Sequence, residues 1–199
     1  IKARLFRNYP LGDVGSHAVG YIGRINQNEK ARIQDSEDEA NYRGTEYIGK
    51  LGIEQSFESS LHGTTGVEQM ETSAGGRAVR KLSSQAATPG DTVMLSIDIK
   101  LQKLIESLYG HRRGALVAID PRNGEILALV SMPTFDPNLF VEGIDAENWA
   151  ALNESIDKPL LNRALRGAYP PGSTYKPFMA LAALQTGKRS ASLVVNDPG

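Results

Sequence analysis

Residues 168–178 constrain the fold more than any other part of this chain of 199 residues. Two consecutive prolines and a glycine favour a sharp turn, and the apolar run that follows, as far as Gln185, predicts a helix that ends before Gly187. Ser173 and Lys176 stand at the start of this predicted helix. Because residues three apart share one face of a helix, the hydroxyl and the amine can meet. This arrangement suits a serine nucleophile with a neighbouring lysine as its base.

The surroundings of the pair favour this chemistry. A lysine acts as a base only when it is neutral, which requires burial or a nearby positive charge. We expect the apolar flank 178–184 to exclude water, and the N-terminal end of the helix to add a partial positive charge. The backbone N–H of Ser173 can serve as one donor of an oxyanion hole. Pro177 cannot donate the hydrogen bond that a helix would direct to the Ser173 carbonyl.

The spacing Ser-x-x-Lys is weak evidence when it stands alone. Ser155 and Lys158 repeat it, also before a proline, within a polar stretch. There we expect a serine that caps a turn and a lysine in solvent. Only at Ser173 do a rigid turn and an apolar helix accompany the spacing.

The composition excludes several kinds of site. The chain has no cysteine, so it forms no disulfide and has no thiolate metal site or cysteine nucleophile. Its net charge of −1 argues against a broad nucleic-acid-binding surface. It contains no apolar run of the roughly 18 residues that indicate a membrane span. We predict no cofactor and no metal site, because the three histidines are scattered and suit structural or surface roles; they are His17, His62 and His111.

The first part of the chain, to about residue 82, mixes short apolar runs with many glycines. Residues 18–23 predict a short strand or buried turn, 25–38 an exposed helix or loop, and 52–63 a helix that ends at a glycine. Glu54 and Glu58 lie four apart on that helix, and we expect a solvated face or a salt bridge between domains rather than a catalytic pair. A small basic cluster should simply be exposed; it consists of Arg77, Arg80 and Lys81.

The small and polar residues 83–90 end in Pro-Gly and predict a linker. Residues 92–97 then predict a strand. Asp98 should cap the next helix, which ends at Gly110. Its apolar residues recur at helical spacing and are Leu101, Leu104, Ile105 and Leu108.

Two β-rich runs, 115–119 and 126–130, flank a turn that contains proline, asparagine and glycine, which favours a β-hairpin. Residues 132–171 contain many prolines and predict a long, irregular connection. The chain as a whole is predicted to have an α+β fold with two domains, residues 1–88 and 89–199.

Several segments, in order along the chain, resemble the class B penicillin-binding proteins, the D,D-transpeptidases that cross-link bacterial peptidoglycan. The resemblance covers nearly the whole chain. Within the class it is strongest to the elongation enzymes of rod-shaped Gram-negative bacteria. The matching catalytic segments are 114–133, 135–143 and 162–178, and those similar to the non-catalytic pedestal are 9–10, 17–23 and 49–54.

The resemblance implies a non-catalytic, dimerisation-type pedestal of mixed α/β structure in residues 1–88. It implies that residues 89–199 are the first part of a serine β-lactamase-like transpeptidase fold, truncated at the C-terminus. Ser173 would attack the penultimate D-Ala carbonyl of a D-Ala-D-Ala stem peptide, with Lys176 as general base. β-Lactam antibiotics would acylate the same serine.

The resemblance also implies partners and a location. The partners would be a SEDS-family glycan polymerase and elongation scaffold proteins. The location would be the periplasmic face of the bacterial inner membrane, with a single-pass anchor expected upstream of residue 1. Nucleic acid is not expected as a partner.

The chain departs from the family at two motifs. Ser-x-Asn and Lys-Thr-Gly, which complete the family's site, do not occur in the sequence, and residues 186–188 have the wrong order for the second. Both ends look cut, and we expect the fragment alone to be inactive. Two alternatives remain: an interaction module whose pedestal docks a polymerase or scaffold, and a β-lactam sensor or β-lactamase relative. The long pedestal-like region argues against the second.

Overall fold

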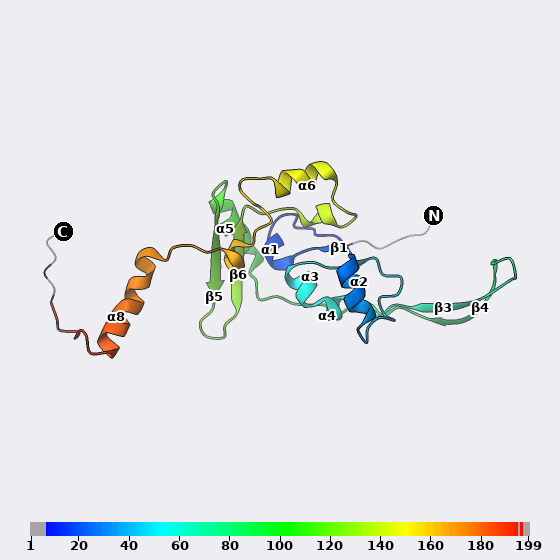
Figure 1. The fold of residues 1–199 in the computed structure, drawn as a ribbon, viewed down its shortest axis with the longest axis horizontal. Coiled ribbons are helices and arrows are strands. Elements are labelled where there is room, and N and C mark those ends of the chain that lie inside the picture. Colours follow the sequence, from blue (N-terminus) through cyan, green and yellow to red (C-terminus); the bar gives the residue numbers. More distant parts are fainter. Residues whose placement is uncertain (1–6, 195, 197–199) are drawn as a thin grey trace. The chain divides into compact units, whose positions relative to one another are not determined.

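In the computed structural model, residues 7–194 and 196 are described, and the chain divides into two compact units, Ile1–Arg166 and Gly167–Gly199 (Figure 1). Helices and antiparallel strand pairs together confirm the predicted α+β class. The first unit contains α1 (Ser16–Val19), β1 (Ile22–Arg24), α2 (Gln27–Gln34), β2 (Tyr47–Gly49), α3 (Gly52–Ser56), α4 (Glu58–His62), β3 (Val67–Thr72), β4 (Ala78–Gln85), α5 (Ile99–Tyr109), β5 (Gly114–Ile119), β6 (Ile126–Met132), the 3-10 helix η1 (Pro137–Phe140), α6 (Ala146–Asn153) and α7 (Arg163–Arg166). The second unit contains the 3-10 helix η2 (Gly172–Tyr175) and α8 (Lys176–Gln185).

The first strand pair, β1 and β2, is antiparallel, with Gly23 opposite Ile48. The predicted short strand near residue 20 is therefore present, although α1 occupies the beginning of that segment. The predicted exposed helix is α2, which lies between the two strands in sequence. It begins with a capping box, in which Asn26 and Glu29 each bond the other's backbone N–H.

The single helix predicted over residues 52–63 is two short helices, α3 and α4. They are separated at Phe57, whose dihedral angles, φ −113° and ψ 23°, are not helical. The predicted end is right, since α4 stops at His62, directly before Gly63.

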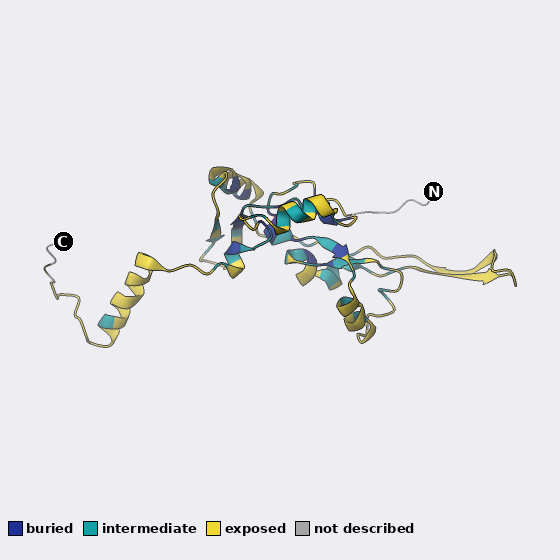
Figure 2. Ribbon diagram, turned by 45° about the horizontal axis from the view of Figure 1, so that its top comes forward, coloured by how far each residue is buried: buried dark blue, intermediate teal, exposed yellow. Residues whose placement is uncertain are grey.

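The hairpin formed by β3 and β4 was not predicted. Every residue of both strands is exposed (Figure 2), so no buried face imposes the alternation that marks a half-buried strand. The predicted linker at 83–90 is partly wrong, because β4 extends to Gln85. The basic cluster is exposed as expected, and two of its members pair across the hairpin: Arg80 with Glu71 and Lys81 with Glu68.

Helix α5 begins as predicted, with the Asp98 carboxylate accepting the backbone N–H of Lys100 at 2.9 Å and of Leu101 at 3.2 Å. Its buried residues are polar, however: Gln102 and Glu106. The predicted apolar face is largely open, with Leu104 and Leu108 exposed.

The Gln102 side chain satisfies the backbone of β6. Its amide oxygen accepts the Leu129 N–H, and its amide nitrogen donates to the Leu129 carbonyl, both at 2.9 Å. The predicted strand over 92–97 is wrong. A strand requires a ladder, but next to β6 only Asp98 donates a backbone bond, to Leu127, before Gln102 occupies the neighbouring groups.

The hairpin of β5 and β6 is confirmed, with antiparallel pairing from Gly114 opposite Met132 to Ile119 opposite Ile126. The expectation that 132–171 is irregular is wrong in part, since η1, α6 and α7 lie within it. The core lies where β6 and the residues after it meet the N-terminal segment. Its buried apolar side chains are Tyr9, Ala128, Val130, Met132, Phe135, Phe140 and Val141.

Candidate active site

Ser173 and Lys176 lie in the second unit, one turn apart at the junction of η2 and α8. The predicted helix is therefore present, but its first turn is a 3-10 helix. The Lys176 backbone N–H donates to the Ser173 carbonyl. This bond explains why Pro177 is tolerated, since the carbonyl that Pro177 cannot reach already has a donor.

The turn before Ser173 is fixed by its own residues. Gly172 has φ 53°, a left-handed conformation that glycine adopts without strain. The Pro171 carbonyl accepts two bonds from Thr174, one from its backbone N–H at 3.2 Å and one from its hydroxyl. The Thr174 hydroxyl is thus committed to the backbone.

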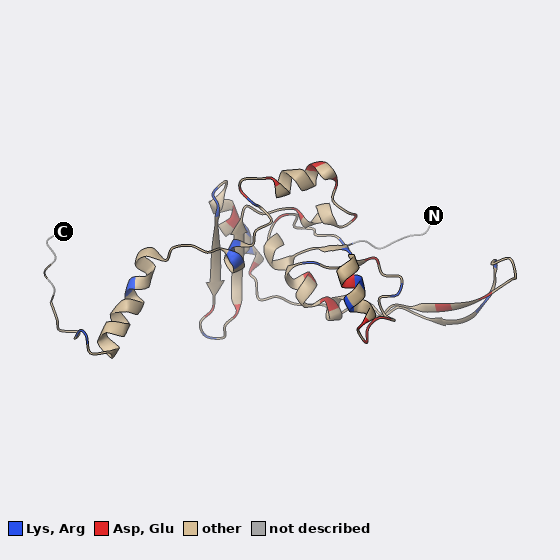
Figure 3. Cartoon of the chain, viewed as in Figure 1, with Lys and Arg blue, Asp and Glu red and all other residues tan. Residues whose placement is uncertain are grey.

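Both candidate side chains are exposed in the second unit. Among the described residues, neither the Ser173 hydroxyl nor the Lys176 ammonium has a side-chain bonding partner. The apolar residues of α8 are also exposed, with Phe178 at 66%, and Lys176 is the helix's one charged residue (Figure 3). The expected dry surroundings of Lys176 and the roles of both residues therefore stay predictions.

The second Ser-x-x-Lys pair is a turn, as expected. The Ser155 hydroxyl accepts the backbone N–H of Asp157 at 3.2 Å, and its carbonyl accepts that of Lys158 at 3.1 Å. Lys158 has φ 43°, which is unusual for a residue other than glycine.

The histidines occupy separate places. Burial lowers the pKa of His17, and the nearby charge of Arg163 lowers it further; its ring meets Phe135 edge-on at 5.1 Å. His62 stacks on Tyr42 at 4.3 Å, and His111 is exposed. Among the residues that the structure describes, no group of three or more potential ligands can hold a metal ion.

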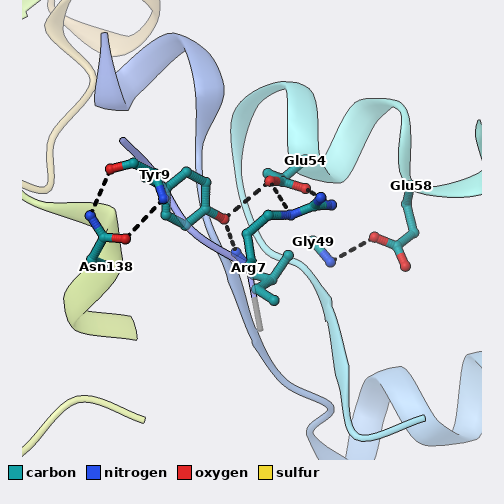
Figure 4. Close-up of polar contacts among 7 residues, drawn as sticks. Arg7, Tyr9, Gly49, Glu54, Glu58 and Asn138 are labelled. Carbon is teal, nitrogen blue, oxygen red and sulfur yellow. Dashed lines mark hydrogen bonds and ion pairs between the residues drawn. The ribbon is translucent and has the colours of Figure 1, made fainter. Parts of the chain in front are cut away.

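Glu54 is buried, at 5% exposure, so the expectation of a solvated face is wrong for this residue. Its carboxylate pairs with Arg7 at 2.9 Å and accepts the Tyr9 hydroxyl at 3.1 Å (Figure 4). The expected salt bridge is thus present within the first unit. Burial and the adjacent Glu54 carboxylate raise the pKa of Tyr9. Glu58 instead accepts the Gly49 N–H at 2.8 Å.

Asn138 was missed by the sequence analysis. Its side-chain oxygen accepts the Tyr9 N–H, and its side-chain nitrogen donates to the Tyr9 carbonyl, both at 2.9 Å (Figure 4). Nearby, Phe140 stacks on Tyr21 at 4.0 Å. These contacts join the N-terminal segment to the residues that follow β6, and no local pattern indicates them.

None of the helices in the described part of the chain is both long and apolar enough to span a bilayer.

Two family models match consecutive parts of the chain. Residues 1–95 match the penicillin-binding protein dimerisation domain, and residues 114–199 match the penicillin-binding protein transpeptidase domain. The domain boundary expected after residue 88 stays a prediction.

The chain is similar to two proteins named peptidoglycan D,D-transpeptidase MrdA. It is 47% identical over 199 residues to the one from Acinetobacter baumannii and 43% identical over 199 residues to the one from Escherichia coli. These alignments cover 100% of this chain but only 29% and 31% of the relatives. The chain thus spans about a third of the length of the curated relatives it matches.

Two solved structures are also similar. The crystal structure of Pseudomonas aeruginosa penicillin-binding protein 2 in complex with WCK 5153 matches with a TM-score of 0.81 and 46% identity, over 98% of this chain and 39% of that one. The complex between penicillin-binding protein 2 and MreC from Helicobacter pylori matches with a TM-score of 0.76 and 31% identity, over 98% of this chain and 34% of that one.

Proposed function

This chain belongs to the class B penicillin-binding proteins, and we propose that it is part of a peptidoglycan D,D-transpeptidase in which Ser173 is the nucleophile and Lys176 its general base. The observation that carries the proposal is the position of the pair. Ser173 and Lys176 are one helical turn apart, after a turn that requires glycine, within the residues that match the transpeptidase model.

The substrate is the D-Ala-D-Ala end of a peptidoglycan stem peptide. The Ser173 oxygen attacks the carbonyl carbon of the penultimate D-Ala, and Lys176 takes the hydroxyl proton. The peptide C–N bond breaks, and the terminal D-Ala leaves as an amine that has received a proton. An amine of a neighbouring strand then attacks the ester and frees Ser173, which completes the cross-link. A β-lactam amide reacts with Ser173 in the same way and leaves it acylated.

The local hydrogen bonds support Ser173 over its neighbours as the nucleophile. The Thr174 hydroxyl is bonded to the Pro171 carbonyl, and the Ser155 hydroxyl accepts a backbone N–H in its own turn. The Ser173 hydroxyl has no such commitment among the described residues. Its position at the start of a helix also places backbone N–H groups and a partial positive charge near a developing oxyanion.

Covalent labelling of the full-length protein with a fluorescent penicillin tests the proposal. We expect label on the wild-type protein and on Ser155→Ala, the matched control with the same spacing, and none on Ser173→Ala. Equal labelling of Ser173→Ala and the wild-type protein would refute the assignment. Rapid release of the label as hydrolysed drug would favour a β-lactamase relative.

The proposed location is the periplasmic side of the inner membrane, and the proposed partners are a SEDS-family glycan polymerase and an elongation scaffold. The complex of the Helicobacter pylori relative with MreC supports a scaffold partner. Co-purification of the full-length protein with each partner from solubilised membranes tests this part. Absence of both partners from the purified material, with penicillin labelling intact, would remove the interaction role and leave the catalytic one.

A further inference from the structure

Arg163, the first residue of α7, carries a positive charge into the protein interior and is 7% exposed. Its guanidinium donates to two successive backbone carbonyls, those of Lys158 at 3.0 Å and Asp157. Within the described part of the chain, no carboxylate forms an ion pair with it. Because a buried charge without a counter-ion is costly, the arrangement requires a compensating role.

The two carbonyls belong to a strained turn. Lys158 is the only residue other than glycine with a positive φ among those the structure describes, at 43°. Such a conformation costs a side-chain-bearing residue roughly 1–2 kcal/mol. The Lys158 carbonyl accepts the Leu161 N–H at 3.1 Å as well as the Arg163 guanidinium. The guanidinium thus holds the backbone in a conformation that it would otherwise leave.

The same loop is attached to its surroundings at both ends of Arg163. The Ser131 hydroxyl, on β6, accepts the Arg163 backbone N–H at 2.8 Å and donates to the Leu161 carbonyl at 3.1 Å. The Asn162 side chain donates to the His17 carbonyl, on α1, at 3.2 Å. Residues 157–163 are therefore held against β6 and α1 by named hydrogen bonds, with the guanidinium at their centre.

We propose that Arg163 is a positioning residue for acylation of Ser173. Its guanidinium holds the Asp157 and Lys158 carbonyls, and so fixes the point in the first unit from which the serine-bearing segment continues. This inference rests on the proposed function. Attack on a carbonyl is sensitive to placement, and a misplacement of about 1 Å far from the chemistry can cost roughly 100-fold in rate.

The test is Arg163→Lys in the full-length protein, because lysine keeps the charge but lacks the planar fork that reaches two carbonyls. Acylation by a labelled penicillin is followed over a range of drug concentrations. We expect the maximal acylation rate constant to fall at least about 10-fold, while the dissociation constant of the non-covalent complex changes less than about 3-fold. Arg166→Lys, on the exposed end of the same helix, should leave both constants unchanged.

A second substitution separates positioning from general damage. Glycine adopts the left-handed conformation without strain. Adding Lys158→Gly to Arg163→Lys should therefore restore much of the lost rate. If Arg163→Lys does not accumulate in folded form, the same measurements are made on Arg163→Gln and its double variant with Lys158→Gly.

Two results would overturn the inference: a wild-type acylation rate in Arg163→Lys, or a slow variant that Lys158→Gly does not improve. Failure of the proposed function gives a different result, namely no Ser173-dependent labelling of the wild-type protein itself.

Discussion

Replacing Tyr9 by phenylalanine tests the network of Figure 4 through a single oxygen atom. The Tyr9 hydroxyl accepts the Ile22 N–H at 2.9 Å and donates to the Glu54 carboxylate at 3.1 Å, and the residue is 8% exposed. Tyr9→Phe keeps the ring and its packing. It leaves the Ile22 N–H without its acceptor and Glu54 with one donor fewer.

The expected loss follows from those two groups. A buried polar group that loses its partner costs about 1–3 kcal/mol. The Ile22 N–H loses its acceptor, whereas Glu54 keeps Arg7, so we expect a total of about 2–3 kcal/mol. For a unit of this size, 1 kcal/mol corresponds to about 2–4 °C in the melting temperature, and the variant should melt roughly 4–12 °C below the wild-type protein.

Tyr42→Phe is the matched control, since it removes the same atom from a half-buried tyrosine. The Tyr42 hydroxyl donates to Glu58 at 3.0 Å, and Glu58 keeps its bond from Gly49. The expected loss is about 1 kcal/mol or less. Scanning calorimetry of the full-length protein measures both variants, and hydrogen exchange at the Ile22 amide should accelerate only in Tyr9→Phe. Equal losses in the two variants, with unchanged exchange at Ile22, would refute the reasoning.

Two further predictions concern the first unit. Because the pKa of His17 is lowered from its model value of 6.5, the unfolded chain binds a proton that the folded one resists; its contribution to stability is complete above about pH 6.5 and is lost as the pH falls towards the depressed pKa. The melting temperature measured between about pH 7 and 5 should therefore fall less in His17→Phe than in the wild-type protein, and an equal fall would contradict this. Gly20 has φ 80°, and an added Cβ would lie 1.8 Å from the Leu51 carbonyl oxygen, so Gly20→Ala should cost more than about 3 kcal/mol in calorimetry. Gly12→Ala, with φ 58° and open space around it, should cost only about 1–2 kcal/mol, and similar losses at both positions would rule out the close contact as the cause.

The elements that could be predicted from the sequence are those whose signals lie within a few residues of one another. The β5–β6 hairpin has two β-rich runs and a turn with glycine and asparagine between them. Helix α5 has its cap at Asp98 and its end at Gly110. The turn before Ser173 likewise has its prolines and glycine in sequence, and all three features are present in the structure.

The elements that could not be predicted depend on partners far along the chain. Asn138 pairs with the backbone of Tyr9 across 129 positions, and neither residue carries a local signal for the contact. Helix α5 shows the same limit, because its hydrophobic spacing indicates the wrong buried face. Gln102 and Glu106 are buried there through bonds to Leu129 and Gly15, which a periodicity of apolar residues cannot represent.

The two Ser-x-x-Lys pairs show where the limit lies for the candidate site. The spacing is identical, and a proline follows in both cases, so the motif alone cannot distinguish them. The structure distinguishes them by the hydroxyl, because Ser155 accepts a backbone N–H within its own turn. A nucleophile requires an oxygen whose lone pairs are available, and a two-residue pattern contains no information about that. Flanking residues improved the prediction at Ser173 because a proline-glycine turn and an apolar helix impose their geometry locally. The protonation state of Lys176, by contrast, depends on whatever surrounds it in the assembled domain, and it has to be measured in the full-length protein.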